Sequence, residues 1–134
     1  MEDKELIKMA IEAREYSFSP ISKFKVGAAL LTKEGKTFKG CNIEDPSGIG
    51  VTNICAERCV IAKAISEGYR EFEKIAVVGG KDDCLEECLP CGACRQYLNS
   101  MCPAIKIISL NNDVIKTYDL EELLPYAFNE EFSN

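Results

Sequence analysis

The sequence contains no histidine among its 134 residues. Mechanisms that need an imidazole base, an imidazole metal ligand or a Ser-His-Asp relay are therefore excluded. A metal ion in this protein must be held by thiolates or carboxylates. The chain has eight cysteines to supply thiolates, so metal binding through sulfur is open to it where histidine chemistry is not.

Long apolar runs and an excess of positive charge are also missing. No apolar stretch approaches the roughly 20 residues that a membrane-spanning helix needs. The formal net charge is −6, which argues against binding to a phosphate backbone. A free nucleoside carries no phosphate, so this charge does not count against it. We therefore expect a small-molecule partner and neither a nucleic acid nor a membrane.

The sequence contains no repeat or low-complexity tract, and we expect no secretory leader. Its first residues, Met1-Glu2-Asp3-Lys4-Glu5, are charged rather than apolar. We therefore expect reduced cysteines and a cytoplasmic location. With 46% hydrophobic residues the chain has enough apolar surface for one core, and we expect a single domain over residues 1–134.

Hydrophobic patterning predicts alternating helices and strands. Helices are expected over residues 3–16, 55–67, 92–101 and 120–124, and strands over residues 24–32, 37–44, 72–78, 105–110 and 114–118. Thr52 or Asn53 is the expected cap of the second helix, and Gly79-Gly80 the expected end of the third strand. This order predicts an α/β fold with a mixed five-stranded sheet and the second and third helices side by side on one face.

Two short stretches hold the residues with the clearest chemistry. They are Cys55-Ala56-Glu57-Arg58 and Pro90-Cys91-Gly92-Ala93-Cys94-Arg95-Gln96. Each opens a predicted helix, where the helix dipole favours a thiolate. Cys91 and Cys94 are three apart, so one helical turn places both sulfurs on the same face. Cys55 is the expected third ligand of the same ion.

Three protein ligands leave a fourth tetrahedral position for water, which is typical of catalytic zinc. Glu57, two residues after Cys55, is the candidate acid that moves a proton between water and substrate. Three thiolates give the ion an excess of negative charge. We expect Arg58 and Arg95 to hydrogen-bond the sulfurs and reduce that excess, although both could instead be solvated helix charges.

Non-catalytic interpretations of the cysteines remain open. Cys55, Cys91 and Cys94 could form a buried structural zinc site or belong to the core. Alternatively, Cys84 and Cys88 could join Cys91 and Cys94 in a four-cysteine zinc or iron–sulfur module. The first alternative needs a fourth ligand and leaves Glu57 without a role, and the second ignores Cys55.

Together the two motifs resemble those of the short, homotetrameric cytidine deaminases of pyrimidine salvage. The likeness covers nearly the whole chain, including Phe24-Lys25-Val26-Gly27-Ala28-Ala29-Leu30, Gly40-Cys41-Asn42-Ile43-Glu44, and Glu122-Leu123-Leu124-Pro125 with Phe128. It implies a three-layer α/β/α sandwich, one Zn²⁺ per subunit and a homotetramer with shared pockets. The implied reaction is hydrolytic deamination of cytidine and 2′-deoxycytidine to uridine and 2′-deoxyuridine, with release of ammonia.

The resemblance also implies contacts with the nucleoside. Asn42 and Glu44 would hold the ribose, and Phe24 would form a wall beneath the nucleoside. Without the resemblance, the polar pair reads as a solvated strand end and Phe24 as a core aromatic.

Three further contacts are implied for the base and for the neighbouring subunit. The backbone N–H of Ala56 would meet the base carbonyl, and the carbonyl of Leu89 would accept a hydrogen bond from the departing amino group. Phe128 would close a neighbouring subunit's pocket; read alone, it is a surface-packed residue.

One segment departs from the family pattern. The loop over residues 45–54 is longer than usual and lacks a tyrosine, and in the family this loop reaches toward the active site. A deaminase of a bulkier cytosine nucleoside, such as blasticidin S, therefore remains an alternative.

Overall fold

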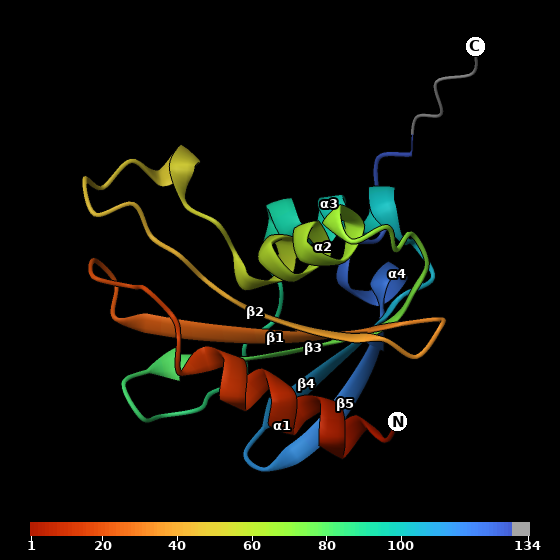
Figure 1. Cartoon of the computed structure of the whole chain (residues 1–134), viewed down its shortest axis with the longest axis horizontal. Coiled ribbons are helices and arrows are strands. Elements are labelled where there is room, and N and C mark those ends of the chain that lie inside the picture. Colours follow the sequence, from red (N-terminus) through yellow and green to blue (C-terminus); the bar gives the residue numbers. More distant parts are fainter. Residues whose placement is uncertain (130–134) are drawn as a thin grey trace.

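The computed structural model describes residues 1–129 and shows one five-stranded sheet between two layers of helix (Figure 1). The elements in chain order are α1 (Asp3–Arg14), β1 (Phe24–Thr32), β2 (Thr37–Cys41), η1 (Gly50–Thr52), α2 (Ala56–Ser66), β3 (Phe72–Lys81), α3 (Gly92–Met101), β4 (Lys106–Asn111), β5 (Val114–Asp119) and α4 (Leu120–Leu123). In the described part of the chain, no helix is long and apolar enough to cross a membrane.

The sheet is mixed, as predicted. Its strands lie in the order β2-β1-β3-β4-β5, and only the β3–β4 pair is parallel. Helix α3 connects these two parallel strands. Figure 1 shows α1 below the sheet and α2, α3 and α4 above it, which confirms the three-layer sandwich with both motif-bearing helices on one face.

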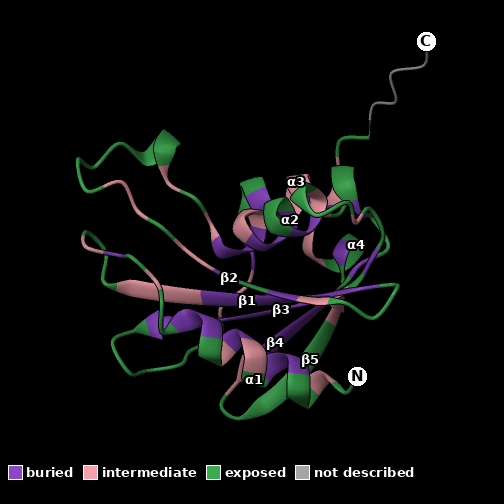
Figure 2. Ribbon diagram, in the orientation of Figure 1, coloured by how far each residue is buried: buried purple, intermediate pink, exposed green. Residues whose placement is uncertain are grey.

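Both faces of the central strands are buried, because neighbouring residues along each strand enter different cores. In β3, Ile75 and Val77 join the hydrophobic cluster between the sheet and helices α2 and α3. Ala76 and Val78 join the hydrophobic cluster between the sheet and α1. Figure 2 shows the buried residues concentrated in this central layer. The sheet is therefore a rigid platform for the N-termini of α2 and α3.

Most predicted boundaries agree with the structure to within two residues, and three features differ more. β2 ends at Cys41 rather than at residue 44, because beyond it Ile43 forms only isolated bridges with Phe18 and Ile54. β3 runs through the glycine pair to Lys81. The N-cap of α2 is Cys55, not Thr52 or Asn53, and its side chain makes no capping hydrogen bond.

Gly27 allows α1 to lie close against β1. A Cβ atom at this position would stand 2.0 Å from the Ala10 carbonyl oxygen and 2.6 Å from the Arg14 nitrogen. No side chain fits there unless the helix moves. The glycine in the Phe24-to-Leu30 motif thus sets the spacing of the lower layer.

We predict that Gly27→Ala lowers the free energy of unfolding by at least about 2 kcal/mol, because the added methyl overpacks this contact. Urea denaturation followed by circular dichroism measures the change. Gly50→Ala is the matched control, since an added Cβ at Gly50 meets nothing within 4 Å. Equal midpoints for the two variants would contradict the role given to Gly27.

Candidate active site

The sulfur atoms of Cys55, Cys91 and Cys94 meet above the sheet. Their Sγ atoms all lie within 4.8 Å of one another, and Cys55 and Cys91 are 3.9 Å apart. Two sulfurs that each lie about 2.3 Å from one tetrahedral zinc stand roughly 3.8 Å apart. The structure therefore confirms that these three cysteines are positioned to hold a metal ion, and soft thiolates suit zinc.

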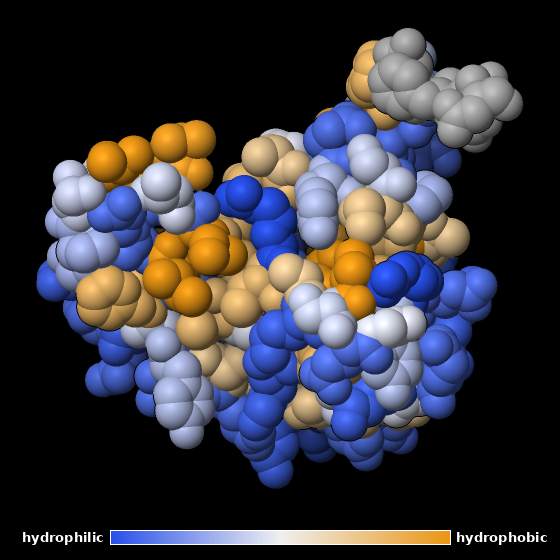
Figure 3. All heavy atoms as spheres, turned by 45° about the horizontal axis from the view of Figure 1, so that its top comes forward, coloured by the Kyte–Doolittle hydropathy of each residue, from blue (hydrophilic) through white to orange (hydrophobic). Residues whose placement is uncertain are grey.

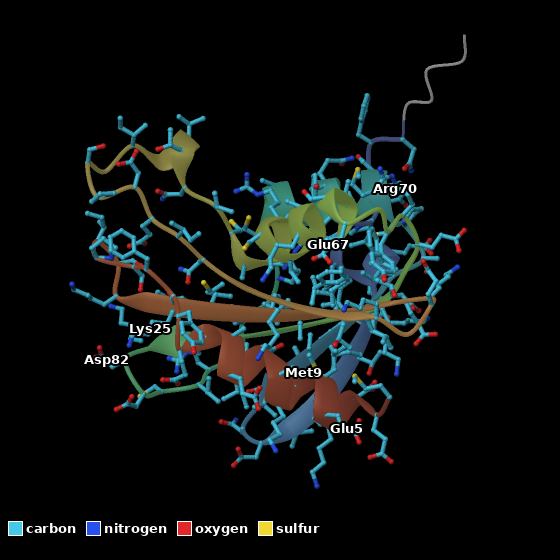
Figure 4. All side chains as sticks on the ribbon, in the orientation of Figure 1. Glu5, Met9, Lys25, Glu67, Arg70 and Asp82 are labelled. Atoms are coloured by element: carbon cyan, nitrogen blue, oxygen red, sulfur yellow. The ribbon has the colours of Figure 1, made fainter. Side chains whose placement is uncertain are left out.

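Helix N-termini bring the three sulfurs together. Cys55 is the N-cap of α2 and Cys91 is the N-cap of α3, while Cys94 lies in the first turn of α3. Pro90 keeps the residue before it extended, so α3 starts sharply at Cys91. Figure 4 shows sulfur atoms gathered at the start of α2. Cys94 is buried and Cys91 is exposed, so the group is open on one side.

Arg58 is the cation beside the sulfurs. Its Nη2 atom donates to Cys55 Sγ at 3.3 Å. Hydrogen bonds from Cys94, Arg58 and Cys91 lower the pKa of Cys55 to about 5, against the opposing effect of burial. The hydrogen bond with Cys55, together with burial, raises the pKa of Cys94. A divalent cation bound to the group would stabilise its cysteines as thiolates.

Glu57 is a buried carboxyl group in the first turn of α2. Only 4% of the residue is exposed. Burial raises the pKa of Glu57 to about 7, with a contribution from the negative charge of Cys55, while its own backbone N–H and Arg58 act in the opposite direction. A carboxyl group with such a pKa can both accept and donate a proton near neutral pH.

Arg95 has a different position from the one expected. Its Nε donates to the Pro90 carbonyl and its Nη1 to the Leu123 carbonyl, each at 2.7 Å. Among the described residues, its hydrogen bonds thus go to backbone oxygens and not to a sulfur. Arg95 ties the start of α3 to α4, and of the two arginines only Arg58 donates to a thiol.

Asn42 lies just beyond β2, with its side chain fixed against β1. Its Oδ1 accepts from the backbone N–H of Val26, and its Nδ2 donates to the Phe24 carbonyl, both at 2.9 Å. The Ser17 hydroxyl also donates to Oδ1. This Ser17 contact could not be predicted, because the two partners are 25 residues apart in the chain.

Glu44 holds the segment before β1. Its Oε1 accepts from the backbone N–H groups of Ile21 at 2.9 Å and Ser22 at 3.1 Å. A hydrogen bond from the Ser22 side chain is the main cause that lowers the pKa of Glu44. Asn42 and Glu44 are thus both pre-oriented, although neither belongs to the strand predicted to carry them.

The 45–54 loop is organised by Asp45. Its carboxylate accepts from the backbone and hydroxyl of Ser47 and from the hydroxyl of Thr52. Ile43 and Ile54 exchange backbone hydrogen bonds at the base of the loop. Val51 at its tip is 89% exposed, and Figure 3 shows apolar atoms on this lobe at the left.

The remaining predicted contacts lie at different depths. Ala56 is fully buried at the first position of α2, Leu89 is half-buried before Pro90, and Phe128 is 65% exposed. The Phe128 carbonyl accepts from Gln96 and Asn99.

The structure does not favour the alternative in which Cys84 and Cys88 join Cys91 and Cys94 in a four-cysteine module. Among residues 1–129, the group of metal-ligating atoms consists of Cys55, Cys91 and Cys94, without Cys84 or Cys88. Cys84 is exposed, whereas Cys88 packs against the core under α2 and α3. The Cys88 thiol nevertheless lies close to Glu57, whose charge adds to burial in raising the pKa of Cys88 to about 12. Sequence reasoning missed this neighbour of the site.

Comparison with known proteins agrees with this geometry. Residues 1–109 match the family model described as the cytidine and deoxycytidylate deaminase zinc-binding region. The chain therefore belongs to the cytidine and deoxycytidylate deaminase family, and the family's zinc fits the three-cysteine group.

Individual relatives are similar over their full length. A cytidine deaminase of Halalkalibacterium halodurans is 47% identical over 136 aligned residues, which cover 100% of this chain and 99% of the relative. The crystal structure of the cytidine deaminase from Burkholderia pseudomallei superposes with a TM-score of 0.86 at 41% identity, covering 96% of this chain and 100% of that one. A blasticidin-S deaminase of Bacillus cereus is 32% identical, with coverage of 95% and 92%.

We predict that Cys55→Ala abolishes tight zinc binding, because two thiolates remain where three are needed. Cys84→Ala, which removes an exposed thiol outside the group, should keep about one zinc per chain. Metal analysis of the purified variants by mass spectrometry measures both. Zinc loss in the Cys84 variant with retention in the Cys55 variant would restore the four-cysteine module.

Proposed function

We propose that this protein hydrolytically deaminates cytidine and 2′-deoxycytidine, giving uridine or 2′-deoxyuridine and ammonia. The observation that carries the proposal is the placement of Glu57, a buried carboxyl group with a pKa raised to about 7, beside an open three-cysteine metal group. A structural zinc site with a fourth ligand would have no use for such an acid. The family membership and the cytidine deaminase relatives support the same reaction.

When bound by Cys55, Cys91 and Cys94, Zn²⁺ supplies a Lewis acid that makes water a nucleophile at neutral pH. The other steps fall to the chain itself. Glu57 takes a proton from the attacking water and delivers it to N3 of the cytosine ring while oxygen adds to C4. Glu57 then carries the proton of the new C4 hydroxyl to the amino group, so that the C4–N bond breaks, ammonia leaves and the C4 carbonyl of uridine forms. Because its side chain is buried, solvent does not compete for these protons.

Arg58 keeps this centre from becoming too negative. Its hydrogen bond to Cys55 withdraws charge from a thiolate ligand, which favours a more acidic water at the metal. In our proposal Arg95 acts differently, by holding the first turn of α3 in place through the Pro90 carbonyl.

Backbone groups position the base. Ala56 occupies the first turn of α2, where N–H groups have no partner within the helix, so its N–H is suited to the base carbonyl. The Leu89 carbonyl precedes Cys91 by two residues and would accept a hydrogen bond from the departing amino group. Both contacts would favour the tetrahedral form of C4 over the flat substrate.

Polar side chains next to β1 hold the ribose. The Asn42 amide has two N–H groups, and one of them donates to the Phe24 carbonyl, which leaves the other for a sugar hydroxyl. The Glu44 carboxylate is fixed by two backbone N–H groups and can accept from the neighbouring hydroxyl. Phe24, half-buried at the start of β1, forms the wall beneath the nucleoside.

A bulkier cytosine nucleoside is the second candidate substrate. The 45–54 loop and the 32% identical blasticidin-S deaminase favour it. The cytidine deaminase of H. halodurans is 47% identical, so cytidine remains the better-supported substrate.

We further propose a homotetramer in which subunits share pockets. The exposed ring of Phe128 and the exposed apolar tip of the 45–54 loop support this, since both would be covered by a neighbouring copy. A cytoplasmic location is supported by eight cysteines that are all free of disulfides.

The purified protein should convert cytidine and deoxycytidine, as followed by the fall in ultraviolet absorbance, and should act on blasticidin S much more slowly. Glu57→Gln should lower kcat by roughly 10²–10⁴-fold with zinc retained, because the proton carrier is lost. Glu67→Gln, an exposed change at the other end of α2, is the control and should behave as wild type. Near-normal turnover by zinc-loaded Glu57→Gln would remove Glu57 from the reaction.

Subunit sharing predicts complementation between two impaired variants. Phe128→Ala should raise KM for cytidine, and mixing it with inactive Glu57→Gln should restore activity at low cytidine, because hybrid pockets combine Glu57 of one copy with Phe128 of another. Steady-state kinetics after subunit exchange measures the gain. Mixing Phe128→Ala with the double variant Glu57→Gln/Phe128→Ala is the control. Equal activity in both mixtures would mean that Phe128 serves its own pocket or none.

A further inference from the structure

Arg14 is a buried arginine that the proposed mechanism does not use. It ends α1 and is 5% exposed. Its Nε donates to the Lys25 carbonyl at 3.0 Å. Its Nη2 lies within hydrogen-bond distance of the carbonyls of Gly80 at 2.8 Å, Asp82 at 2.5 Å and Cys84 at 2.8 Å.

These partners are unusual for a buried cation. Among residues 1–129, the ion pairs do not include Arg14, so backbone oxygens alone compensate its charge. A buried guanidinium is costly unless its N–H groups find acceptors, and here three of the acceptors belong to one short turn. The turn over residues 80–84 therefore wraps around the guanidinium.

The turn is also very tight. A Cβ atom on Gly80 would stand 2.1 Å from the Cys84 carbonyl oxygen, so a side chain at position 80 would push Cys84 away. Asp82 adopts a positive φ of 51° within the same turn. Figure 4 labels Lys25 and Asp82, which lie next to each other at the end of the sheet where α1 ends.

From this turn the chain leads directly into the active site. The Glu86 N–H donates to the Gly79 carbonyl at 2.9 Å, which returns the chain to β3. Cys88 Sγ then lies 2.9 Å from where a Cβ of Gly79 would stand, and a Phe24 ring carbon lies 3.1 Å from that point. Cys88 therefore packs beside Phe24 on the side of the site that holds Glu57, three residues before Cys91.

We propose that Arg14 is a positioning residue for the deaminase site, which it serves by shaping the 80–84 turn so that Cys88 is held against Gly79 and Phe24. Hydrogen bonds to the guanidinium hold the turn in its shape. The turn then fixes the position of the wall of the nucleoside pocket. The kinetic part of this inference rests on the proposed function, whereas the structural part does not.

Thiol labelling tests the inference without reference to activity. In Arg14→Met, a reagent such as iodoacetamide should label Cys88 at least about tenfold faster than in the wild type, because the turn opens locally. Cys102 is the internal reference, since it is buried at the end of α3 away from the turn. Its labelling should stay slow, as mass spectrometry of the peptides would show. Faster labelling of both cysteines together would mean general destabilisation and would overturn the proposal.

Kinetics and matched variants complete the test. Arg14→Met should raise KM for cytidine about 5- to 10-fold with kcat within about threefold and zinc retained, because the wall moves while the proton chemistry remains. Arg70→Met is the control, since Arg70 also donates to backbone carbonyls but on an exposed loop beyond α2.

Gly80→Ala disturbs the same turn without changing Arg14, because the added methyl meets the Cys84 carbonyl. This variant tests the proposal if Arg14→Met does not fold. It should expose Cys88 in the same way. Protected Cys88 with unchanged KM would overturn the role of Arg14. Absence of cytidine turnover in the wild type, with Cys88 still exposed in the variants, would overturn the proposed function alone.

Discussion

Three sulfur atoms can grip one ion only if the segments that carry them are brought to within a few ångströms, and here two helix N-termini do this. Cys55 and Cys91 begin α2 and α3, and Cys94 follows one turn later. The positive ends of the two helix dipoles favour thiolates at this point. The two-sided sheet beneath keeps both helices in place, so the hydrophobic core is what fixes the distances at the metal group.

The same helix start that supplies a metal ligand also supplies the acid. Glu57 follows Cys55 by two residues, so it enters the buried side of α2 while Cys55 faces the neighbouring helix. Burial raises the pKa of Glu57, and Arg58 moderates the shift. In the proposed mechanism, metal ligand, proton carrier and neutralising cation thus come from one turn of helix, which is how a chain without histidine would carry out acid–base chemistry.

Much of this arrangement could be predicted from the sequence, because it depends on local spacing. The sulfur separation within α3, the helix starts and the five strands all follow from patterns a few residues long. The hydrogen bonds of Arg95 were not predicted, because adjacency to Cys94 does not fix the direction of the side chain, which donates to the carbonyls of Pro90 and Leu123. Gly79-Gly80 looked like the end of a strand, but the missing side chains instead admit Cys84 and Cys88 from the following connection.

The contacts of Arg14 with the 80–84 turn and of Ser17 with Asn42 were beyond prediction, because they join residues 25 to 70 positions apart. An arginine in the last turn of a helix reads as a surface charge that favours the dipole, and only the fold shows that it is buried. Contacts of this kind depend on how whole layers pack, which a single sequence does not reveal.

The single parallel pair of strands has a consequence for how the site assembles during synthesis. β3 and β4 are joined by the crossover that contains α3, so the last sulfur ligand lies on the helix that precedes the last two strands of the sheet. The β1–β2 hairpin and α1 leave the ribosome first and can pair early, whereas the metal group must wait for residue 94. Zinc uptake is therefore a late event in the maturation of each nascent chain, coupled to docking of the crossover onto a half-built sheet.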